Sequence, residues 1–585
     1  MSSSLRLLLE DFLSLMREEG ELDVYLPLLL SAMGHEIVYR AQKGTRQYGV
    51  DISSVGKDED GKKKLFLWLV KCGDIGRRDW NSGDQSIRPS IDDVGDTYLA
   101  SHVAPQHAKL TKKLVVLTNG DFNAAINLTI AQYLTMWTVR LGVEAATVNG
   151  STLAAWTERY LLDEHVLPEK NRALLRRMLA NVGTPELSIA VGQALIQDLV
   201  SAAKNPARSA SAKRKQQLGA LRGIRTALSV LQIWAQNERN LLAPYRLAEF
   251  AVLCVWAGMH GEVLAGNRDV AHEFAELLFQ MAAIAETYHE RVQPYYVTQD
   301  AFAHVLPDSL IVTDTVFSEL GRLGLQGCIW ACHAVQGAGL MAEGLASVYV
   351  NRVLALLMSH SCSQSPCYDH HSADIHSAML LLLIGGRQAE ASEWLGHLVG
   401  RLAQVARVPK HWPMTAPFED SLAIKHGHET PSPEFRSTST LVPILLLWAA
   451  VLGMNDVYAY VRTQILPELK DTTPNCWSAD VGFDALVANP VDLSAHGVGE
   501  GMMHVPEESA EFLSTMIAAL PGIEPVESAA WYKQRAAYIP LLAALHWRLQ
   551  VPREMLARQA IAVADVSWYE QVAAQSGPRE PGADL

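Results

Sequence analysis

The stretch from Gly34 to Gly73 decides the fold of the N-terminal part of the chain. It reads GHEIVYRAQKGTRQYGVDISSVGKDEDGKKKLFLWLVKCG, with an apolar run over 65–70 that ends at Lys71 and an acidic residue, Asp51, in the segment before it. A lysine at the end of an apolar strand needs a partner or a function, because an unpaired buried charge is costly. Asp51 and Lys71 are therefore the first candidates for a functional site.

Short apolar runs on both sides of this stretch predict a mixed α/β domain over residues 1–167. The sequence Asp60-Gly61 favours a hairpin turn between two of the predicted strands. The order α-β-β-β-α-β-α-β-α predicts helices on the faces of a mixed sheet. We expect strands over 35–42, 48–56, 64–72, 113–118 and 144–148, and helices over 5–33, 87–102, 124–141 and 152–162.

Beyond residue 168 the strand signals nearly vanish, and long segments rich in Leu, Ala and Trp predict a large all-α region over 168–574. A single bundle of that size is unfavourable, so we expect paired helices stacked as an irregular helical repeat or solenoid, in one or two subdomains. No repeat of fixed period is visible. Residues 575–585, rich in Gly and Pro, predict a disordered tail. The helices are expected over 171–182, 186–204, 212–240, 244–259, 269–289, 346–358, 373–384, 389–405, 440–452, 455–464 and 531–550.

The composition indicates an intracellular, core-forming protein. Apolar residues make up 49% of the 585 residues, and the formal net charge of −14 argues against a uniformly basic surface for nucleic acid. No uninterrupted apolar run is long enough to span a bilayer, and the first residues lack the pattern of a signal peptide. The seven cysteines are an odd number and thinly spread, which predicts reduced thiols. We therefore expect a cytoplasmic protein without membrane association.

The N-terminal order and spacing resemble the PD-(D/E)xK restriction-endonuclease-like superfamily, especially its Mrr-like branch, over roughly the first quarter of the chain. In that family a helix precedes a three-stranded meander, whose second strand carries a metal-binding Asp. The third strand carries an acid or Gln two residues before a Lys. Asp51 and Lys71 occupy the Asp and Lys positions, and Glu36 stands where a Glu at the end of the first helix often joins the site.

The resemblance implies hydrolysis of nucleic-acid phosphodiester bonds, with DNA as the expected substrate. Mg²⁺ or Mn²⁺ would be held by Asp51, Glu36 and the backbone carbonyl of Val70, because Mg²⁺ prefers one or two carboxylates together with waters and phosphate oxygens. Lys71 would position the attacking water and offset the developing charge. The combination with a helical region is similar to bacterial anti-phage defence proteins, and this role rests on analogy alone.

One position departs from the family pattern. Leu69 stands where Glu, Asp or Gln is usual, and strand alternation puts it on the same side as Lys71, but leucine cannot ligate a metal. Substitute acids are available just after the strand and on the following helix: Asp74, Asp92, Asp93 and Asp96. Two interpretations remain: an active nuclease, or a catalytically degenerate nuclease fold that binds nucleic acid or acts as a scaffold. A third acid near Asp51 and Lys71 discriminates between them.

A basic segment follows the α/β domain. Residues 170–225 carry eleven basic and two acidic side chains, which predicts either a strip for an anionic partner such as nucleic acid or a solvated helix face. We interpret residues 209–215 as a flexible basic loop. The helical region is a candidate for self-association or for a protein partner. The candidate nucleic-acid-binding residues are Arg88, Arg176, Arg177, Lys213, Arg214 and Lys215.

Ligand-type side chains also gather between residues 360 and 376: His360, Cys362, Cys367, His370, His371 and His376. Zinc uses such ligands, but the two cysteines are more widely spaced than in usual zinc knuckles and no second pair follows. The sequence therefore favours a polar loop between helices over a metal site.

Overall fold

The computed structural model divides the chain into two compact units, Met1–Leu247 and Ala248–Leu585. The boundary predicted at residue 167 is the point where the mixed α/β pattern gives way to helices. The division into compact units lies further on, so that the first unit also includes three helices after the sheet. The predicted tail over 575–585 lies outside the described residues. The structure describes residues 9–10, 13–14, 16, 18, 22–40, 48–82, 86–161, 169–264, 267–334, 339–408, 412–416, 418–479, 497–499, 503–518, 536 and 538–564.

The first unit is built on a mixed five-stranded sheet with the order β1-β2-β3-β4-β5. The first three strands form an antiparallel meander, and β3, β4 and β5 run parallel. The central strands β3 and β4 are near-continuous apolar runs, as expected for strands covered on both faces. The predicted mixed sheet is confirmed. The strands are β1 (Glu36–Arg40), β2 (Ile52–Lys57), β3 (Lys63–Lys71), β4 (Thr111–Thr118) and β5 (Glu144–Val148).

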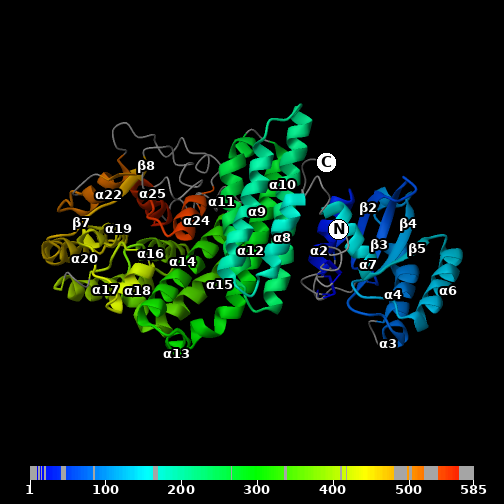
Figure 1. The fold of residues 1–585 in the computed structure, drawn as a ribbon, viewed down its shortest axis with the longest axis horizontal. Helices are drawn as coiled ribbons and strands as arrows, with labels where there is room; N and C mark the ends of the chain where they lie inside the picture. Colours follow the sequence, from blue (N-terminus) through cyan, green and yellow to red (C-terminus); the bar gives the residue numbers. More distant parts are fainter. Residues whose placement is uncertain are drawn as a thin grey trace. The chain divides into compact units, whose positions relative to one another are not determined.

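Helices cover both faces of this sheet (Figure 1). On one face, Leu67 and Leu69 of β3 pack in a hydrophobic cluster with Ile91 of α4 and Ile130 of α6. On the other face, the ring of Trp68 meets the ring of Trp156 from α7 edge to face. The helices of this domain are α2 (Asp23–Ala32), α3 (Arg77–Asn81), α4 (Ile87–Asp93), α5 (Leu99–Ser101), α6 (Ala124–Leu141) and α7 (Gly150–Trp156).

A network of charges closes the end of the sheet at the β2–β3 turn. Lys64 is almost fully buried, and its Nζ lies 2.7 Å from Asp58, 3.0 Å from Asp60 and 2.8 Å from Glu144. Lys113 of β4 adds a second contact to Asp58, at 2.9 Å. The network compensates the buried ammonium and links the turn to β4 and β5.

Three helices complete the first unit: α8 (Glu169–Ala180), α9 (Pro185–Lys204) and α10 (Ala210–Asn237). The predicted flexible loop over 209–215 is wrong, because these residues form the start of α10. The side chain of Ser209 accepts a hydrogen bond from the backbone N–H of Ala212 at 3.2 Å, which caps the helix at its first turn.

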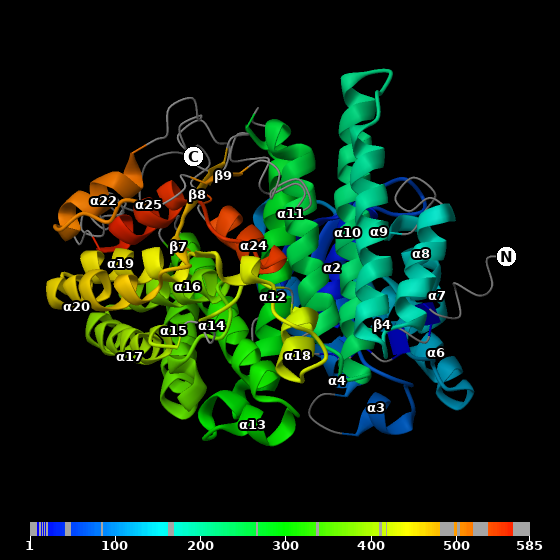
Figure 2. The same cartoon turned by 60° about the vertical axis from the view of Figure 1, so that its left-hand side comes forward.

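The second unit is a large helical region, as predicted. Helix α14 packs against both α15 and α16 (Figure 2). Two short strand pairs accompany the helices. They are β6 (Thr438–Ser439) with β7 (Thr473–Pro474), and β8 (Trp477–Ala479) with β9 (Gly497–Gly499). Helix α11 (Leu242–Leu264) contains the division between the units. The others are α12 (Arg268–Val297), α13 (Ala301–Val305), α14 (Ser309–His333), α15 (Gly339–Ser359), α16 (His371–Ile384), α17 (Gln388–Ala406), α18 (Phe418–Lys425), α19 (Leu441–Val451), α20 (Asn455–Tyr460), α22 (Ser509–Ile517), α24 (Tyr538–Trp547) and α25 (Arg553–Ala564).

The close contact between α14 and α16 depends on glycine. Gly321, Gly324 and Gly327 recur every three residues along α14. A Cβ at Gly324 would overlap the backbone of Ser377 on α16. The helices expected from the sequence did not include 309–333 as one element, because three glycines weaken the helical signal of the segment. The same glycines allow the two helices to approach closely.

Two helices of the described residues are long and apolar enough to cross a membrane by length and composition alone. The segments are Leu242–Glu262, of which 72% of the most apolar window is buried in the protein, and Met341–Ser359, of which 39% is buried. The core helix of a soluble protein passes the same test, so these are weak candidates. The absence of a membrane association stays a prediction.

Candidate functional site

Asp51 and the end of β3 lie side by side. Ile52 pairs with Trp68 in the β2–β3 register, so Asp51, one residue earlier, stands beside the last residues of β3. Its backbone N–H donates to the carbonyl of Trp68 at 2.9 Å. The backbone N–H of Val70 donates to Asp51 Oδ2 at 2.7 Å. The carboxylate is thus fixed against the main chain of the residue that precedes Lys71.

Strand geometry directs the carbonyl of Val70 to the side of β3 on which Asp51 lies. The N–H and C=O of one residue in a strand face the same neighbouring strand, and the N–H of Val70 faces Asp51. The structure therefore brings together three of the predicted groups: the Asp51 carboxylate, the Val70 carbonyl and the start of the Lys71 side chain.

An acidic residue that the sequence analysis missed lies beside Lys71. Glu18 Oε1 is 3.2 Å from Lys71 Nζ. The segment that carries Glu18 is held at the end of β3, because the carbonyl of Met16 accepts hydrogen bonds from Asn119 Nδ2 at 2.8 Å and from Cys72 Sγ at 3.0 Å. Glu18 was missed because we expected one continuous helix over 5–33. In the structure, helix α2 begins only at Asp23, and Glu18 precedes it.

Glu36 does not lie with Asp51 and Lys71, contrary to the prediction. It is exposed on β1, where it pairs with Val55 of β2. Val55 is four residues beyond Asp51, which corresponds to about 13 Å along the strand. Because β1 runs antiparallel to β2, the start of β1 faces the far end of β2, away from the site.

The predicted substitute acids have other partners or face elsewhere. Asp74 accepts a hydrogen bond from the backbone N–H of Asp121 at 2.9 Å. Asp92 accepts one from the Tyr133 hydroxyl at 2.5 Å, and both Asp92 and Asp96 lie 4.0 Å from Arg140 of α6. Asp93 is exposed at the end of α4. None of these contacts leads toward Lys71.

The pKa of Asp51 is raised by burial and by neighbouring acids. Burial raises its pKa, while the hydrogen bond from Val70 and the charge of Lys71 lower it. The charges of Glu18 and Asp23 raise it again. In the part of the chain that the structure describes, Lys71 therefore lies beside two carboxylates, Asp51 and Glu18, that act on each other's charge. Among the described residues, however, Asp51 does not belong to any group of three ligand atoms within 4.8 Å of one another.

The candidate nucleic-acid-binding residues fall into separate places. Arg88 is exposed on α4, with its guanidinium 5.1 Å from the centre of the Tyr133 ring. Arg176 and Arg177 lie in the second half of α8, near the turn into α9, whereas residues 213–215 follow the turn after α9. Helix α9 spans about 30 Å between these turns. Arg176 and Arg177 therefore lie toward the opposite end of this group of helices from Lys213, Arg214 and Lys215.

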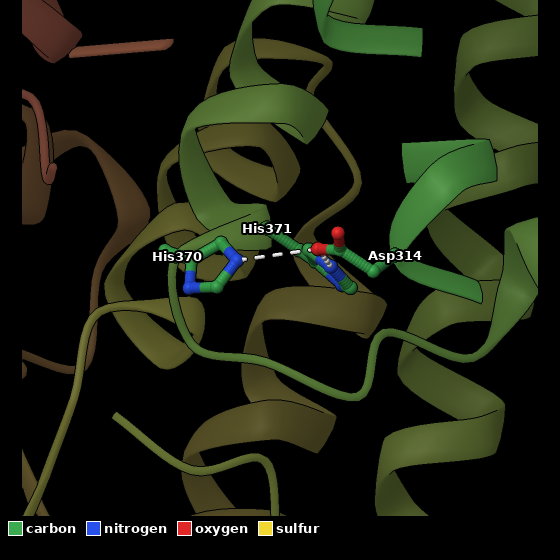
Figure 3. A group of neighbouring side chains, drawn as sticks. All are labelled: Asp314, His370 and His371. Atoms are coloured by element: carbon green, nitrogen blue, oxygen red, sulfur yellow. Dashed lines mark hydrogen bonds and ion pairs between the residues drawn. The ribbon is translucent and has the colours of Figure 1, made fainter. Parts of the chain in front are cut away.

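The histidine-rich segment of the second unit contains a compact cluster that includes a residue from another helix (Figure 3). His370 precedes α16 and His371 is its first residue. Both turn Nε2 toward Asp314 Oδ1 of α14, at 3.5 and 3.2 Å. Cys362 and Cys367, which drew attention in the sequence, do not belong to this group. Asp314 was missed because it precedes His370 by 56 positions and carries no local signal.

No family model, no curated protein and no solved structure matches this chain. The proposals below rest on the sequence pattern and on the geometry of the described residues.

Proposed function

We propose that the first unit contains a PD-(D/E)xK-type nuclease domain that hydrolyses phosphodiester bonds of DNA with Mg²⁺ or Mn²⁺. The observation that carries the proposal is the position of Asp51, whose Oδ2 lies 2.7 Å from the backbone N of Val70, next to Lys71. Glu18, 3.2 Å from Lys71, supplies the further acid that Glu36 does not. The helix, meander and crossover order of the mixed sheet agrees with this proposal.

The donor set suits a hard cation. Carboxylates of Asp51 and Glu18 and the carbonyl of Val70 are oxygen donors, which Mg²⁺ and Mn²⁺ prefer. When bound, such an ion makes a water nucleophilic and stabilises the charge on the phosphoryl oxygens. Lys71 holds its ammonium at the same strand end, where it orients the water and offsets negative charge. The burial of Asp51 keeps its carboxylate in one orientation.

The second candidate function is nucleic-acid binding by a catalytically degenerate nuclease fold. Leu69 favours it, because this side chain is 1% exposed within the hydrophobic cluster and contributes no ligand. The lack of a three-ligand group around Asp51 among the residues that the structure describes points the same way. Both functions predict DNA binding, and only the first predicts cleavage.

A plasmid-cleavage assay with Mg²⁺ or Mn²⁺ tests the nuclease. We expect the wild-type protein to cut, and Asp51→Asn, Lys71→Ala and Glu18→Gln to lose at least about 100-fold in rate, as removal of charge-stabilising groups does. Glu36→Gln is the matched control, because it removes an acid that the sequence placed in the site and the β1 register places outside it. Equal cleavage by all five proteins would contradict the proposal. No cleavage with intact DNA binding would favour the degenerate fold.

DNA binding is tested through its dependence on salt. Replacing Lys213, Arg214 and Lys215 by Ala should weaken binding and reduce the slope of log K against log salt by up to about 3, since each neutralised phosphate releases a counterion. The matched control replaces three exposed lysines around the β2–β3 turn, Lys57, Lys62 and Lys63. Equal losses in both variants would mean that only net charge matters.

For the second unit, we propose an irregular solenoid of paired helices that self-associates or binds a protein partner in the cytoplasm. The side-by-side packing of α14 with α15 and α16 and of α16 with α17 supports this architecture. A role in anti-phage defence remains an analogy. Sedimentation of the full chain with and without DNA measures the oligomeric state, and a monomer in both conditions would remove self-association from the proposal.

A further inference from the structure

We propose that Asp314, His370 and His371 form a zinc site, independent of the candidate nuclease centre. The ligand atoms of these residues lie within 4.8 Å of one another, and no other His, Cys, Asp or Glu group of this kind occurs among the described residues. The two imidazoles and the carboxylate converge from α14 and from the start of α16 (Figure 3).

The distances fit a metal better than a hydrogen-bond network. His371 Nε2 and His370 Nε2 lie 3.2 and 3.5 Å from Asp314 Oδ1. The His371 distance is at the upper end of the range for N–H···O hydrogen bonds, and the His370 distance exceeds that range. Ligands about 2.0 Å from a tetrahedral zinc ion are separated by about 3.3 Å, which lies between the two distances. The site therefore has the spacing that an ion between the three atoms requires.

Aromatic contacts fix the two imidazoles. The ring of His371 stacks on Phe317 of α14, with centroids 4.4 Å apart and planes 11° from parallel. The ring of His370 stacks on Tyr368, with centroids 4.8 Å apart and an angle of 12°. The two imidazoles are themselves perpendicular, with centroids 5.2 Å apart. Adjacent residues at the start of a helix would normally point apart, and this packing instead directs both Nε2 atoms to one carboxylate oxygen.

The buried side of the site is short of hydrogen-bond partners. His371 is fully buried, and its Nδ1 has no hydrogen-bond partner. Its polar interactions are therefore concentrated on Nε2, which is aimed at Asp314. A bound ion would replace the long Nε2 contact with a coordination bond, whereas Nδ1 would still lack a partner among the described residues.

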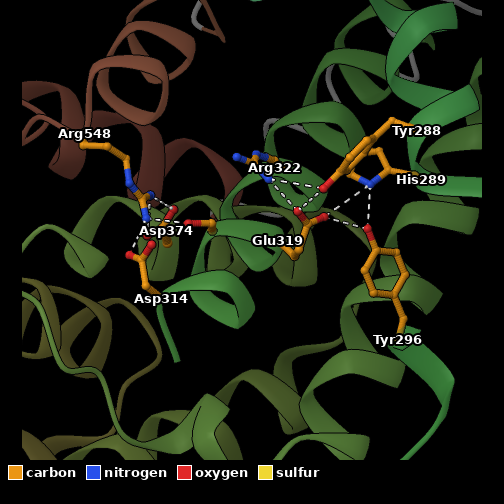
Figure 4. Close-up of polar contacts among 9 residues, drawn as sticks. Tyr288, His289, Tyr296, Asp314, Glu319, Arg322, Asp374 and Arg548 are labelled. Carbon is orange, nitrogen blue, oxygen red and sulfur yellow. Dashed lines mark hydrogen bonds and ion pairs between the residues drawn. The ribbon is translucent and has the colours of Figure 1, made fainter. Parts of the chain in front are cut away.

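Arg548 contacts the same carboxylate (Figure 4). Its Nη2 lies 2.9 Å from Asp314 Oδ1, and its Nη1 lies 2.9 and 3.0 Å from the two oxygens of the buried Asp374. Because the guanidinium is shared between Asp314 and Asp374, it does not serve Asp314 alone, and negative charge on Asp314 remains for a cation. Arg548 then orients a metal ligand, as supporting hydrogen bonds commonly do in metal sites.

The ligand types select the metal. Two imidazoles and one carboxylate suit Zn²⁺, whereas Mg²⁺ prefers oxygen donors throughout. The side chains of Asp314 and His370 are 23% and 18% exposed, so the site is open to solvent on one side. Three protein ligands with solvent access leave a fourth position for water, which is the arrangement of zinc sites that do chemistry rather than of closed structural sites.

Metal binding by the full-length chain tests the proposal. The protein is stripped with a chelator, dialysed against Zn²⁺ and analysed for bound metal, and Co²⁺ is titrated as a visible probe. We expect one tightly held ion per chain and the intense absorption of four-coordinate Co²⁺. Asp314→Asn, His370→Ala and His371→Ala should each weaken binding at least tenfold, consistent with the loss of one of three ligands. His397→Ala, at an exposed histidine of α17, is the control and should bind as the wild type does.

Folding is checked separately from binding. His370 is the more exposed of the two histidines, so His370→Ala should keep the wild-type circular dichroism and melting temperature in chelator while losing the metal-induced rise in melting temperature. Asp51→Asn, which tests the nuclease, should retain the ion. Less than about 0.1 ion per wild-type chain after dialysis, or equal retention by all three ligand variants, would overturn the zinc site.

Discussion

At the scale of single residues, several buried charges of the described residues lie in groups with opposite charges. Lys64 is compensated by three carboxylates, and Arg548 lies between two. Glu319 is fully buried and binds Arg322, together with two tyrosine hydroxyls (Figure 4). Removal of one partner from such a group leaves an uncompensated charge, which is far more costly than the intact group is stabilising.

The Asp58 network leads to a prediction about stability. Contacts with Lys64 and Lys113 hold the pKa of Asp58 well below its ordinary value, despite an opposing effect of burial. The contribution of Asp58 to the free energy of unfolding is therefore fully present above the ordinary pKa of an aspartate. It is lost as the pH falls toward the lowered pKa. Asp58→Asn should lower the free energy of unfolding by about 2 kcal/mol at pH 7, as loss of charged hydrogen bonds does. Asp60→Asn, at a more exposed partner of Lys64, should cost less in the same urea-unfolding measurement.

The candidate site could be predicted from sequence only where its residues are neighbours in the strands. Asp51, Val70 and Lys71 follow from strand order and alternation, and their proximity in the structure agrees with that expectation. Glu18 and Asp314 could not be found in this way, because their positions depend on how helices pack rather than on any local pattern. Glu36 was misplaced because an antiparallel edge strand reverses which end meets the site.

At the scale of elements, the turn before β2 depends on one glycine. Gly49 has a φ of +76°, and a Cβ there would overlap the carbonyl of Ser90 on α4. Gly61, in the β2–β3 turn, also has a φ of +76° but has open space around it. A substitution at Gly61 therefore tests backbone strain alone, whereas the same substitution at Gly49 tests strain together with the contact to α4.

We expect Gly61→Ala to lower the free energy of unfolding by about 1–2 kcal/mol, the cost of a left-handed conformation for a residue with a Cβ. Gly49→Ala should cost clearly more, because α4 has to move as well. Urea unfolding of both variants provides the comparison. Equal losses would mean that the Ser90 contact is not rigid.

In the helices of the second unit, two glycine-to-alanine substitutions should have opposite effects on stability. Gly324→Ala should destabilise the protein, because the added methyl group meets the backbone of α16. Gly344→Ala, in α15 with open space around it, should stabilise by about 1 kcal/mol, since alanine favours helix over glycine. Thermal unfolding measures both, and a stabilising Gly324→Ala would contradict the close approach of α14 and α16.

The fold was predictable at this scale to the extent that apolar periodicity is visible. All five strands of the sheet were found, with ends within a few residues. Helix α14 was not, since its glycines serve a contact that only the folded unit contains. Helix α10 was expected from residue 212, yet residues 209–215 were also interpreted as a loop, because serine and basic residues are common in loops. Ser209 in fact caps the helix.

At the scale of the whole molecule, buried histidines should govern the response to acid. Burial lowers the pKa of His289 and of His376 to about 4 in each case. The unfolded chain binds protons at these residues near pH 6.5, so stability falls as the pH drops from 6.5 toward 4. Asp374 opposes this, because burial raises its pKa to about 7 and its contribution to stability is lost as the pH rises through that value.

We therefore expect the free energy of unfolding, measured in chelator, to fall between pH 6.5 and 4.5. His376→Asn should reduce the slope by up to about 1.4 kcal/mol per pH unit, the contribution of one proton. The exposed His397 provides the control substitution, which should leave the slope unchanged. An unchanged slope in His376→Asn would mean that this histidine is not held neutral in the folded protein.

The contacts of Asp314 also set an order of events during synthesis. Its partners follow it by 56, 57 and 234 positions in the chain, and the last of them is Arg548. The first unit ends at Leu247, about 300 residues before that arginine is made. Ribosomes add about 5–20 residues per second, so the sheet domain can be complete for about 15–60 s before the Asp314 cluster can close. A nascent chain therefore presents its candidate nuclease centre well before its helical unit is finished.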